Sequence, residues 1–244
     1  DDFSGLRACE ARVWSFFRTF DKSMDKYKKH IMGDASEEPM PLYIIPDRKV
    51  SLADVREGMR NHYEGTELSM TNDPGAGVYK VPYRWRPMTF KSEGREYFNE
   101  PAISAQQTGF VRIAQMRSWL PDAVGGILWF GVDDANTAVL TPMYASITEI
   151  PECYRRGNGS MTEFSWTSAF WIHNWVANMA YNRYEPMIRD IRPVQKELED
   201  SYVDLVKNTD AKALELLKSS PAQATAYLTE VCGKGATEAT RRWQ

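Results

Sequence analysis

The most constraining feature of the sequence is residues 127–132 (ILWFGV), a run that contains no polar side chain. A strand with one face in water alternates apolar and polar residues, whereas a strand covered on both faces does not. Two further short apolar segments, residues 110–116 and 138–144, flank this run across turns rich in Pro, Gly, Asp and Asn. The sequence therefore predicts a buried sheet layer with helices packed outside it.

Two helices are predicted before these strands. In residues 8–28 the apolar side chains recur at the three- and four-residue spacing of an amphipathic helix. Ser51 is expected to cap the second helix, with Asp54 as its capping-box partner, and Gly65 to end it. Residues 66–108 are punctuated by Pro and Gly, so we expect a long, loop-rich segment, which in a compact domain is often functional.

Helices are predicted again after the strands. Residues 166–185 are apolar nearly all round, which is typical of a buried helix, and Pro186 is expected to break it. The apolar spacing continues to about Lys207, and two short helices, 210–219 and 221–232, are expected to follow and to end at Gly233. The order of helices, strands and helices predicts an α+β domain. Its helical, loop-rich, strand and helical parts are expected over residues 8–65, 66–108, 109–148 and 165–232.

Composition excludes several classes of protein. The 244 residues include 30 Lys and Arg against 33 Asp and Glu, a net charge of -3, which argues against a nucleic-acid binder. No apolar run approaches the roughly 18 residues that cross a bilayer, so we expect a soluble chain without a membrane span, in the cytoplasm or exported. Cys9, Cys153 and Cys232 are far apart and lack the spacing of metal ligands, so a structural zinc site built from cysteines is not expected.

Two polar side chains are candidates for chemistry. Asn72 precedes Asp-Pro-Gly, so it either makes an ordinary Asx turn or offers its amide to an oxyanion. Arg117 follows a predicted strand and is either a solvated or salt-bridged side chain or a functional cation. His173 is interpreted as a core histidine within its aromatic helix, and Asp133-Asp134 as a turn and not a metal site.

Seven stretches, taken in order, carry a resemblance to a known family. They are residues 50–55 (VSLADV), 61–66 (NHYEGT), 69–77 (SMTNDPGAG), 83–87 (YRWRP), 115–121 (QMRSWLP), 126–131 (GILWFG) and 169–171 (AFW). Together they resemble the cysteine dipeptidases of the N-terminal-nucleophile hydrolase superfamily, over about residues 8–200. The resemblance implies an αββα sandwich and hydrolysis of dipeptides without a cofactor. It also implies a nucleophilic cysteine at the mature N-terminus, whose α-amine manages the proton.

The sequence departs from that family pattern at its first residue. The chain begins with Asp1, and its earliest cysteine, Cys9, lies within a predicted helix. We therefore expect the C-terminal half of a dipeptidase about twice as long, incomplete as a fold and inactive alone. Its expected partners are a dipeptide substrate and either the N-terminal half of the same enzyme or a second copy of the chain.

The resemblance implies roles for a few side chains. Arg117 stands where related amidases place an arginine beside the catalytic cysteine, and Asn72 resembles an asparagine used at the oxyanion. Tyr83 and Trp85, with Arg84 between them, either line the substrate cleft or pin the long loop to the core. Two alternatives to the dipeptidase stay open: a non-catalytic module that binds peptides or a partner chain, and a related amidase with another acyl substrate.

Overall fold

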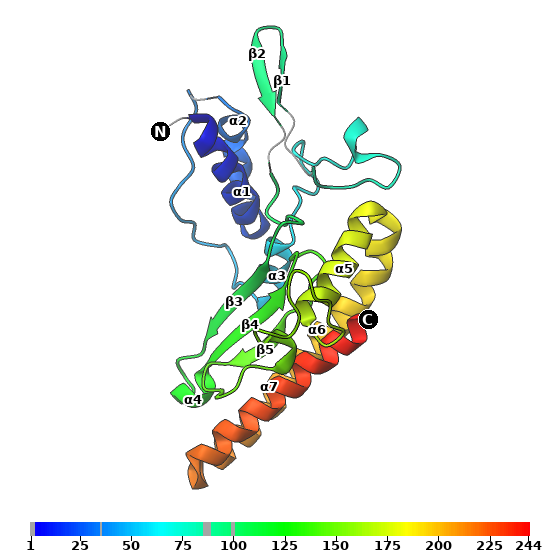
Figure 1. Ribbon diagram of the computed structural model, residues 1–244. Coiled ribbons are helices and arrows are strands. Elements are labelled where there is room, and N and C mark those ends of the chain that lie inside the picture. Colours follow the sequence, from blue (N-terminus) through cyan, green and yellow to red (C-terminus); the bar gives the residue numbers. More distant parts are fainter. Residues whose placement is uncertain (1–2, 35, 85–88, 99–100) are drawn as a thin grey trace. The chain divides into compact units, whose positions relative to one another are not determined.

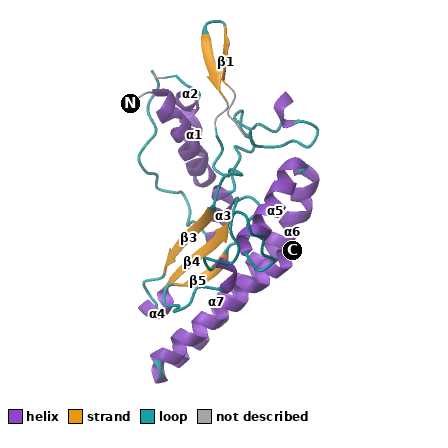
Figure 2. Cartoon of the chain, in the orientation of Figure 1, coloured by secondary structure: helices purple, strands orange, loops and turns teal. Residues whose placement is uncertain are grey.

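The computed structural model of the chain describes residues 3–34, 36–84, 89–98 and 101–244. These residues divide into two compact units, residues 1–105 and residues 106–244, here called the first and second unit. Each unit combines helices with a small antiparallel sheet (Figures 1 and 2). The predicted α+β class is therefore confirmed.

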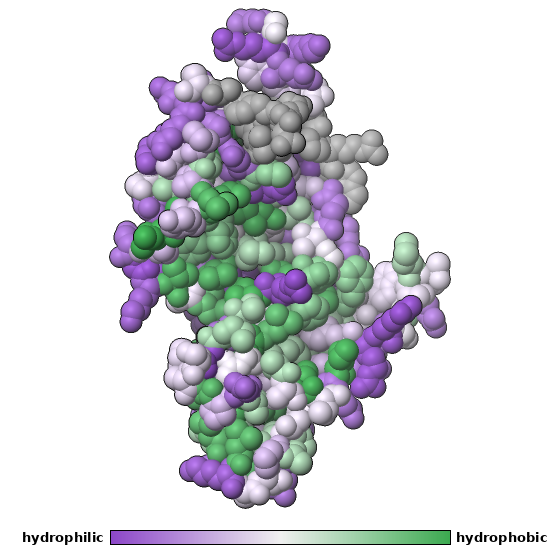
Figure 3. Space-filling model, turned by 90° about the vertical axis from the view of Figure 1, so that its left-hand side faces the viewer, coloured by the Kyte–Doolittle hydropathy of each residue, from purple (hydrophilic) through white to green (hydrophobic). Residues whose placement is uncertain are grey.

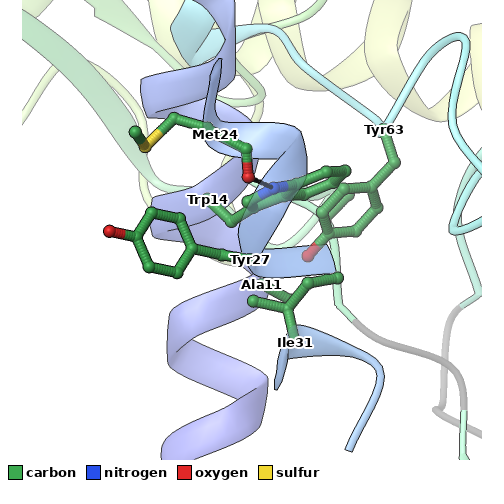
Figure 4. Packing of buried hydrophobic residues seen from close by; sticks show 7 residues of the cluster. Ala11, Trp14, Met24, Tyr27, Ile31 and Tyr63 are labelled. Carbon is green, nitrogen blue, oxygen red and sulfur yellow. Dashed lines mark hydrogen bonds between the residues drawn. The ribbon is translucent and has the colours of Figure 1, made fainter. Parts of the chain in front are cut away.

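The first unit is built around the amino-terminal helix. Its elements are α1 (Phe3–Phe20), η1 (Lys22–Tyr27), α2 (Lys28–Ile31), α3 (Leu52–Met59), η2 (Pro74–Ala76), β1 (Thr89–Ser92) and β2 (Arg95–Phe98). The core forms at Trp14 of α1, whose indole N–H donates to the carbonyl of Met24 at 2.8 Å and so ties η1 to α1 (Figure 4). A buried indole needs such a partner for its single donor. The other buried members of this core are Ala11, Tyr27, Ile31, Tyr63 and Ala102.

Helix α3 begins where the sequence predicts. The hydroxyl of Ser51 accepts the N–H of Asp54 at 3.2 Å, and the Asp54 carboxylate accepts the N–H of Ser51 at 2.8 Å, so the capping box is confirmed. The helix stops well short of Gly65. The reason is local, because the side chain of Asn61 accepts the N–H of Tyr63 at 2.7 Å and holds the chain in a turn.

A hairpin lies within the segment predicted to be rich in loops. Strands β1 and β2 pair antiparallel, with Ser92 opposite Arg95. The two residues between them, Glu93 and Gly94, have φ angles of 50° and 76°. A two-residue hairpin turn requires these left-handed conformations. Glu is an unusual residue at the first of these positions, so the turn has only a weak signal in the sequence.

The second unit contains a three-stranded antiparallel sheet in the order β3-β4-β5. The strands are β3 (Phe110–Met116), β4 (Gly126–Val132) and β5 (Thr141–Tyr144), with the short helix α4 (Asp122–Gly125) between the first two. The first two strands match the predicted segments 110–116 and 127–132 almost to the residue. The burial of β4 agrees with its continuous apolar run.

Helices follow the sheet. They are η3 (Glu152–Tyr154), α5 (Ala169–Asn182), α6 (Tyr184–Ser219) and α7 (Pro221–Trp243). Both α6 and α7 are longer than predicted: Pro186 lies in the first turn of α6, and Gly233 lies inside α7. The predicted break falls just before Pro186, at Arg183 between α5 and α6. In a first turn a proline lacks only an N–H that has no partner within the helix, so α6 accommodates Pro186.

The third strand begins later than predicted, because residues 133–140 form an irregular and fully buried segment. Side chains of α6 satisfy its backbone. Gln195 donates to two carbonyls of the segment at 2.6 and 3.1 Å, and Glu199 accepts the N–H of Leu140 at 3.0 Å. These contacts replace the ladder hydrogen bonds that a strand would have made.

Helices α6 and α7 cover one face of the sheet (Figure 1). Tyr144 of β5 reaches α6, where its hydroxyl donates to Asp210 at 2.7 Å. Tyr202 of α6 in turn donates to the carbonyl of Gly235 in α7 at 2.9 Å. Trp129 of β4 is buried beneath this layer. The core of the second unit therefore lies between the sheet and the long helical pair.

Candidate functional site

Arg117 lies directly after β3 and is held by three acceptors. Its guanidinium forms a two-pronged ion pair with Asp210 of α6, in which Nη2 donates to Oδ1 at 3.1 Å and Nη1 to Oδ2. Nη2 also donates to the carbonyl of Val124 at 2.5 Å, and Nε to the carbonyl of Gly125 at 3.3 Å. Four of the five guanidinium N–H groups are thus directed to acceptors, and the side chain is 7% exposed.

Asp210 also accepts the hydroxyl of Tyr144. Burial raises the pKa of Tyr144 above its usual value, and the hydrogen bond to a carboxylate adds to that shift. Tyr144 therefore stays a neutral donor at physiological pH. The guanidinium carbon of Arg117 lies 5.9 Å from the centroid of the Tyr144 ring. The three side chains form one polar cluster between the sheet and α6.

Asn72 lies in the loop of residues 69–77 in the first unit. Asp73, and not Asn72, makes the turn, because its carboxylate accepts the N–H of Ala76 at 3.0 Å and pairs with Arg84. Asn72 is exposed, and within the described residues its side chain makes no hydrogen bond. The Asx-type turn therefore belongs to Asp73, and the carboxamide of Asn72 is left open to a ligand.

Arg84 holds this loop in place. Besides its pair with Asp73, it donates to the carbonyl of Met70 at 2.9 Å. A Cβ on Gly75 would lie 2.5 Å from the Arg84 Nε, so only glycine lets the backbone pass over the guanidinium. Tyr83 is buried. Trp85 lies outside the described residues.

The two predicted catalytic residues fall in different units, Asn72 in the first and Arg117 in the second. What the sequence did not reveal is the partner of Arg117. Asp210 sits in the middle of a long helix, where one more acidic residue on a polar face carries no local signal. Only the fold shows that it is the acceptor for Arg117.

The two buried cysteines offer no activated thiolate. All three are free thiols. Cys153 and Cys232 are buried, and burial raises the pKa of both thiols, that of Cys232 to about 11. Both therefore remain protonated at neutral pH. Cys9 is exposed on α1, where its sulfur accepts from Arg12 at 3.8 Å.

Asp133 is a buried carboxyl that sequence analysis assigned only to a turn. It is 1% exposed and has a φ of 69°. Its Oδ1 accepts the N–H of Asp134 at 2.7 Å, while Oδ2 has no partner among the described residues. Burial raises the pKa of Asp133 to about 6. The turn was predicted correctly, but its burial was not.

His173 of α5 is a core histidine, as predicted. Its Nδ1–H donates to the carbonyl of Ala169 at 2.9 Å, and its ring stacks on Trp243 with the centroids 5.7 Å apart. Burial lowers the pKa of His173 to about 4, so the ring is neutral at physiological pH. In the described part of the chain Nε2 has no partner.

Within the residues that the structure describes, no three His, Cys, Asp or Glu side chains gather as metal ligands. In the same residues, no helix combines the length and the apolar character needed to cross a membrane.

The chain is similar to known proteins along most of its length. The model of "Peptidase family C69" matches residues 1–197. A "Probable dipeptidase" of Latilactobacillus sakei is 26% identical over 231 residues, which cover 88% of this chain and 43% of that protein. A "Probable dipeptidase B" of Lactococcus lactis subsp. lactis (strain IL1403) is 26% identical over 221 residues, 87% of this chain and 42% of that protein. "Dipeptidase A" of Lactobacillus helveticus is 21% identical over 193 residues, 78% of this chain and 33% of that protein.

The chain therefore spans well under half the length of these relatives. The family match covers the motifs on which the sequence resemblance rests, including those around Asn72 and Arg117. The resemblance is confirmed: this chain belongs to peptidase family C69, the cysteine dipeptidases of the N-terminal-nucleophile type.

Proposed function

We propose that this chain is the C-terminal part of a cysteine dipeptidase, to which it contributes sheet, cleft wall and supporting polar groups. The observation that carries the proposal is the family match over residues 1–197, together with relatives that are named dipeptidases. The relatives extend far beyond the part that aligns with this chain, so there is room in them for the catalytic nucleophile.

The nucleophile in this proposal is a cysteine outside the chain. Its thiolate attacks the scissile carbonyl carbon, and the α-amine takes the thiol proton and returns it to the leaving amine as the C–N bond breaks. Water then hydrolyses the thioester. The protonated state of the buried Cys153 and Cys232 supports this assignment, since neither thiol is prepared for attack.

Arg117 is proposed as the cation beside this nucleophile. Asp210 and two carbonyls fix the guanidinium in position and use four of its N–H groups, which leaves one Nη1–H for a carboxylate or thiolate. A fixed positive charge lowers the pKa of a nearby thiol. The same ion pair also gives Arg117 a structural role, so a test must measure both turnover and stability.

Asn72 is proposed as a donor to the oxyanion of the tetrahedral intermediate. Its open carboxamide, on a loop that Asp73 and Arg84 hold rigid, supports that role. Preorganised donors stabilise developing charge without having to reorient during the reaction. Tyr83 and Trp85 follow on the same segment and are proposed to contribute to the wall of the cleft.

The sheet of the second unit supports the incomplete αββα sandwich. Side chains alternate along a strand, so Phe110 and Met116 of β3 point away from the face that Tyr144 shares with the helices. They are 56% and 78% exposed, and β3 is an end strand of its sheet. Figure 3 shows the hydropathy of one face of the molecule, on which apolar residues (green) are interspersed with hydrophilic ones (purple). An open strand edge beside exposed apolar side chains is typical of an interface.

The proposed occupant of this face is the N-terminal part of the same enzyme, whose strands would extend β3 and supply the second sheet. A second copy of the chain is the alternative occupant. Light scattering on the purified chain, with and without the co-expressed N-terminal part, distinguishes the two. A stable monomer that binds no hydrophobic dye would show that the sheet needs no partner.

The test of the function compares the 244-residue chain with the complete natural protein. We expect the complete protein to hydrolyse unblocked dipeptides, to lose activity on thiol alkylation, and to keep it when Cys9, Cys153 and Cys232 are all replaced by alanine. The chain alone should show no turnover. Dipeptide hydrolysis by the chain alone that survives these replacements would overturn the proposal. Peptide binding without cleavage by the complete protein would identify a binding module, and cleavage of other acyl amides only would identify a related amidase.

A further inference from the structure

Two adjoining cavities open on the second unit, away from the cluster of Arg117. One has a volume of about 520 Å³ and lies at the start of α5, between that helix and residues 153–161. The other has a volume of about 510 Å³ and lies along the same helix. Trp171 and Asn174 line both, so the two cavities adjoin each other at these residues.

Ser168, the N-cap of α5, lines the first cavity and has an unused hydroxyl. The residue is 6% exposed, and its side chain makes no capping hydrogen bond to its own helix. Ser220, the N-cap of α7, does accept the N–H of Gln223 at 3.3 Å. Ser168 is therefore a buried polar side chain that faces the cavity without a partner among the described residues.

The first turn of α5 adds donors at the same place. The first hydrogen bond of this helix runs from the N–H of Ile172 to the carbonyl of Ser168 at 3.2 Å. The N–H groups of residues 169–171 precede it and have no acceptor within the helix. Together with the helix dipole, such groups favour an anion.

The wall of this cavity carries two arginines, and they differ in whether they form ion pairs. Arg155 pairs with Glu149 at 3.7 Å and with Glu152 at 3.1 Å, so its guanidinium is already engaged by two carboxylates. Arg156 is exposed and forms no ion pair within the described residues. At the rim of the first cavity, Arg156 is therefore the arginine that is left to pair with an anionic ligand.

The second cavity is aromatic. The Phe164 ring is 4.8 Å from that of Trp166 and 5.9 Å from that of Trp175, centroid to centroid. Asn174 and Asn178 are the polar residues of its lining. The Nδ2 of Asn178 donates to the Asn174 carbonyl at 2.7 Å and to the Asn174 Oδ1 at 3.1 Å, so the Asn178 amide is fixed in orientation. No charged side chain lines this part of the site, so it suits a neutral apolar ring.

We propose that the two cavities form one binding site for an aromatic carboxylate, that is, a small molecule such as an aromatic amino acid or the C-terminal residue of a short peptide. The carboxylate lies at the start of α5, against Ser168 and Arg156, and the ring packs against the outer faces of Trp166 and Trp175, whose own rings are in contact with their centroids 5.5 Å apart. The site is distinct from the polar cluster of Arg117, and the proposal stands independently of the dipeptidase activity.

Three probe ligands test it in the complete protein that carries this chain. They are N-acetyl-L-phenylalanine, its uncharged amide N-acetyl-L-phenylalaninamide, and acetate, which has no ring. Calorimetry measures affinity, and tryptophan fluorescence reports on the aromatic part of the site. The acid should bind about tenfold more tightly than the amide, the effect of one charge-assisted hydrogen bond, and acetate should bind more weakly than the acid.

Variants locate the binding. Ser168→Ala and Arg156→Gln should each lower the affinity for the acid about three- to tenfold, since each removes a contact to the carboxylate only. The affinity for the amide should stay the same in both variants. Trp175→Ala should lower the affinity for both the acid and the amide. Ser220→Ala is the matched control, because it removes an N-cap hydroxyl that does cap its helix: it should lower the melting temperature and leave both affinities unchanged.

Turnover distinguishes this binding site from a catalytic one. Dipeptide hydrolysis, where present, should be the same in Ser168→Ala and Arg156→Gln as in the natural protein. Equal affinity for the acid and the amide would overturn the proposal. So would failure of both to bind up to their solubility limit, or an affinity for the acid that neither Ser168→Ala nor Arg156→Gln changes. Arg156 is exposed, so its variant keeps the test valid even if Ser168→Ala unfolds.

Discussion

Arg117 and Asp210, 93 positions apart in the chain, form a two-pronged ion pair that joins the end of β3 to the middle of α6. The arginine is 7% exposed and the aspartate 17%. Removing one partner of such a pair leaves the other charge buried without compensation. The pair is therefore a structural constraint on the second unit as well as the setting of a proposed catalytic cation.

We predict that Arg117→Ala destabilises the protein by about 3 kcal/mol, the lower end of the range for a broken buried pair, because Asp210 retains some contact with water. Urea denaturation followed by circular dichroism measures this change. Arg241→Ala is the control, since its pair with Glu238 is exposed and its loss should leave the midpoint unchanged. An unchanged midpoint for Arg117→Ala would contradict the structural role.

Turnover tests the catalytic role of Arg117 separately. Arg117→Lys keeps the positive charge but loses the two-pronged geometry, so it should retain more stability than Arg117→Ala. If Arg117 acts beside the nucleophile, this variant should still lower kcat/KM by about tenfold or more, the effect of one charge-assisted contact. Full activity in a folded Arg117→Lys protein would restrict the residue to its structural role.

Asn72 and Asp73 are neighbours with opposite expected phenotypes. Asn72→Ala in the complete protein should lower kcat by about 100-fold or more, as loss of one oxyanion donor does, without changing the melting temperature. Asp73→Ala removes the acceptor of the Ala76 N–H and the partner of Arg84, and should cost about 1 kcal/mol of stability. Full turnover by Asn72→Ala would remove Asn72 from the site.

Asp133 should make stability fall as pH rises. Burial raises its pKa in the folded protein to about 6 from 3.8, so the folded state holds the proton more tightly than the unfolded state. Its contribution is fully present below about pH 4 and is lost as pH rises to about 6, on the order of 2–3 kcal/mol. Asp133→Asn should remove this dependence, and asparagine tolerates the φ of 69°. An unchanged pH profile in this variant would show that Asp133 does not titrate in this range.

The titration of His173 should change stability with pH in the opposite direction to that of Asp133, over an overlapping range of pH. Burial lowers its pKa to about 4 from 6.5, so its contribution to stability is present above about pH 6.5 and is lost as pH falls towards 4. The two groups partly cancel in the natural protein. His173→Phe keeps a ring against Trp243 but removes the titration of the histidine. Only the pH dependence due to Asp133 should then remain, so the stability of this variant should rise as pH falls from 6 to 4. The two single variants should therefore have slopes of opposite sign in denaturation experiments across this range.

Local sequence was sufficient where the physical cause is local. The apolar run of residues 127–132 predicts β4, and the pair Ser51 and Asp54 predicts the start of α3, because burial on both faces and capping depend on adjacent residues. The hairpin of residues 89–98 escapes prediction because its turn begins with Glu93, a residue that seldom adopts the left-handed conformation.

By itself the sequence determined the α+β class, two of the three strands of the second sheet and, through its motifs, the dipeptidase family. Only the tertiary structure decided that residues 133–140 are buried, that Asp210 is the acceptor for Arg117, and that Ser168 faces a cavity. Each of these depends on side chains from elements distant in the chain. Such contacts leave no periodic trace in the residues that make them, because the fold, and not neighbouring sequence, brings the partners together.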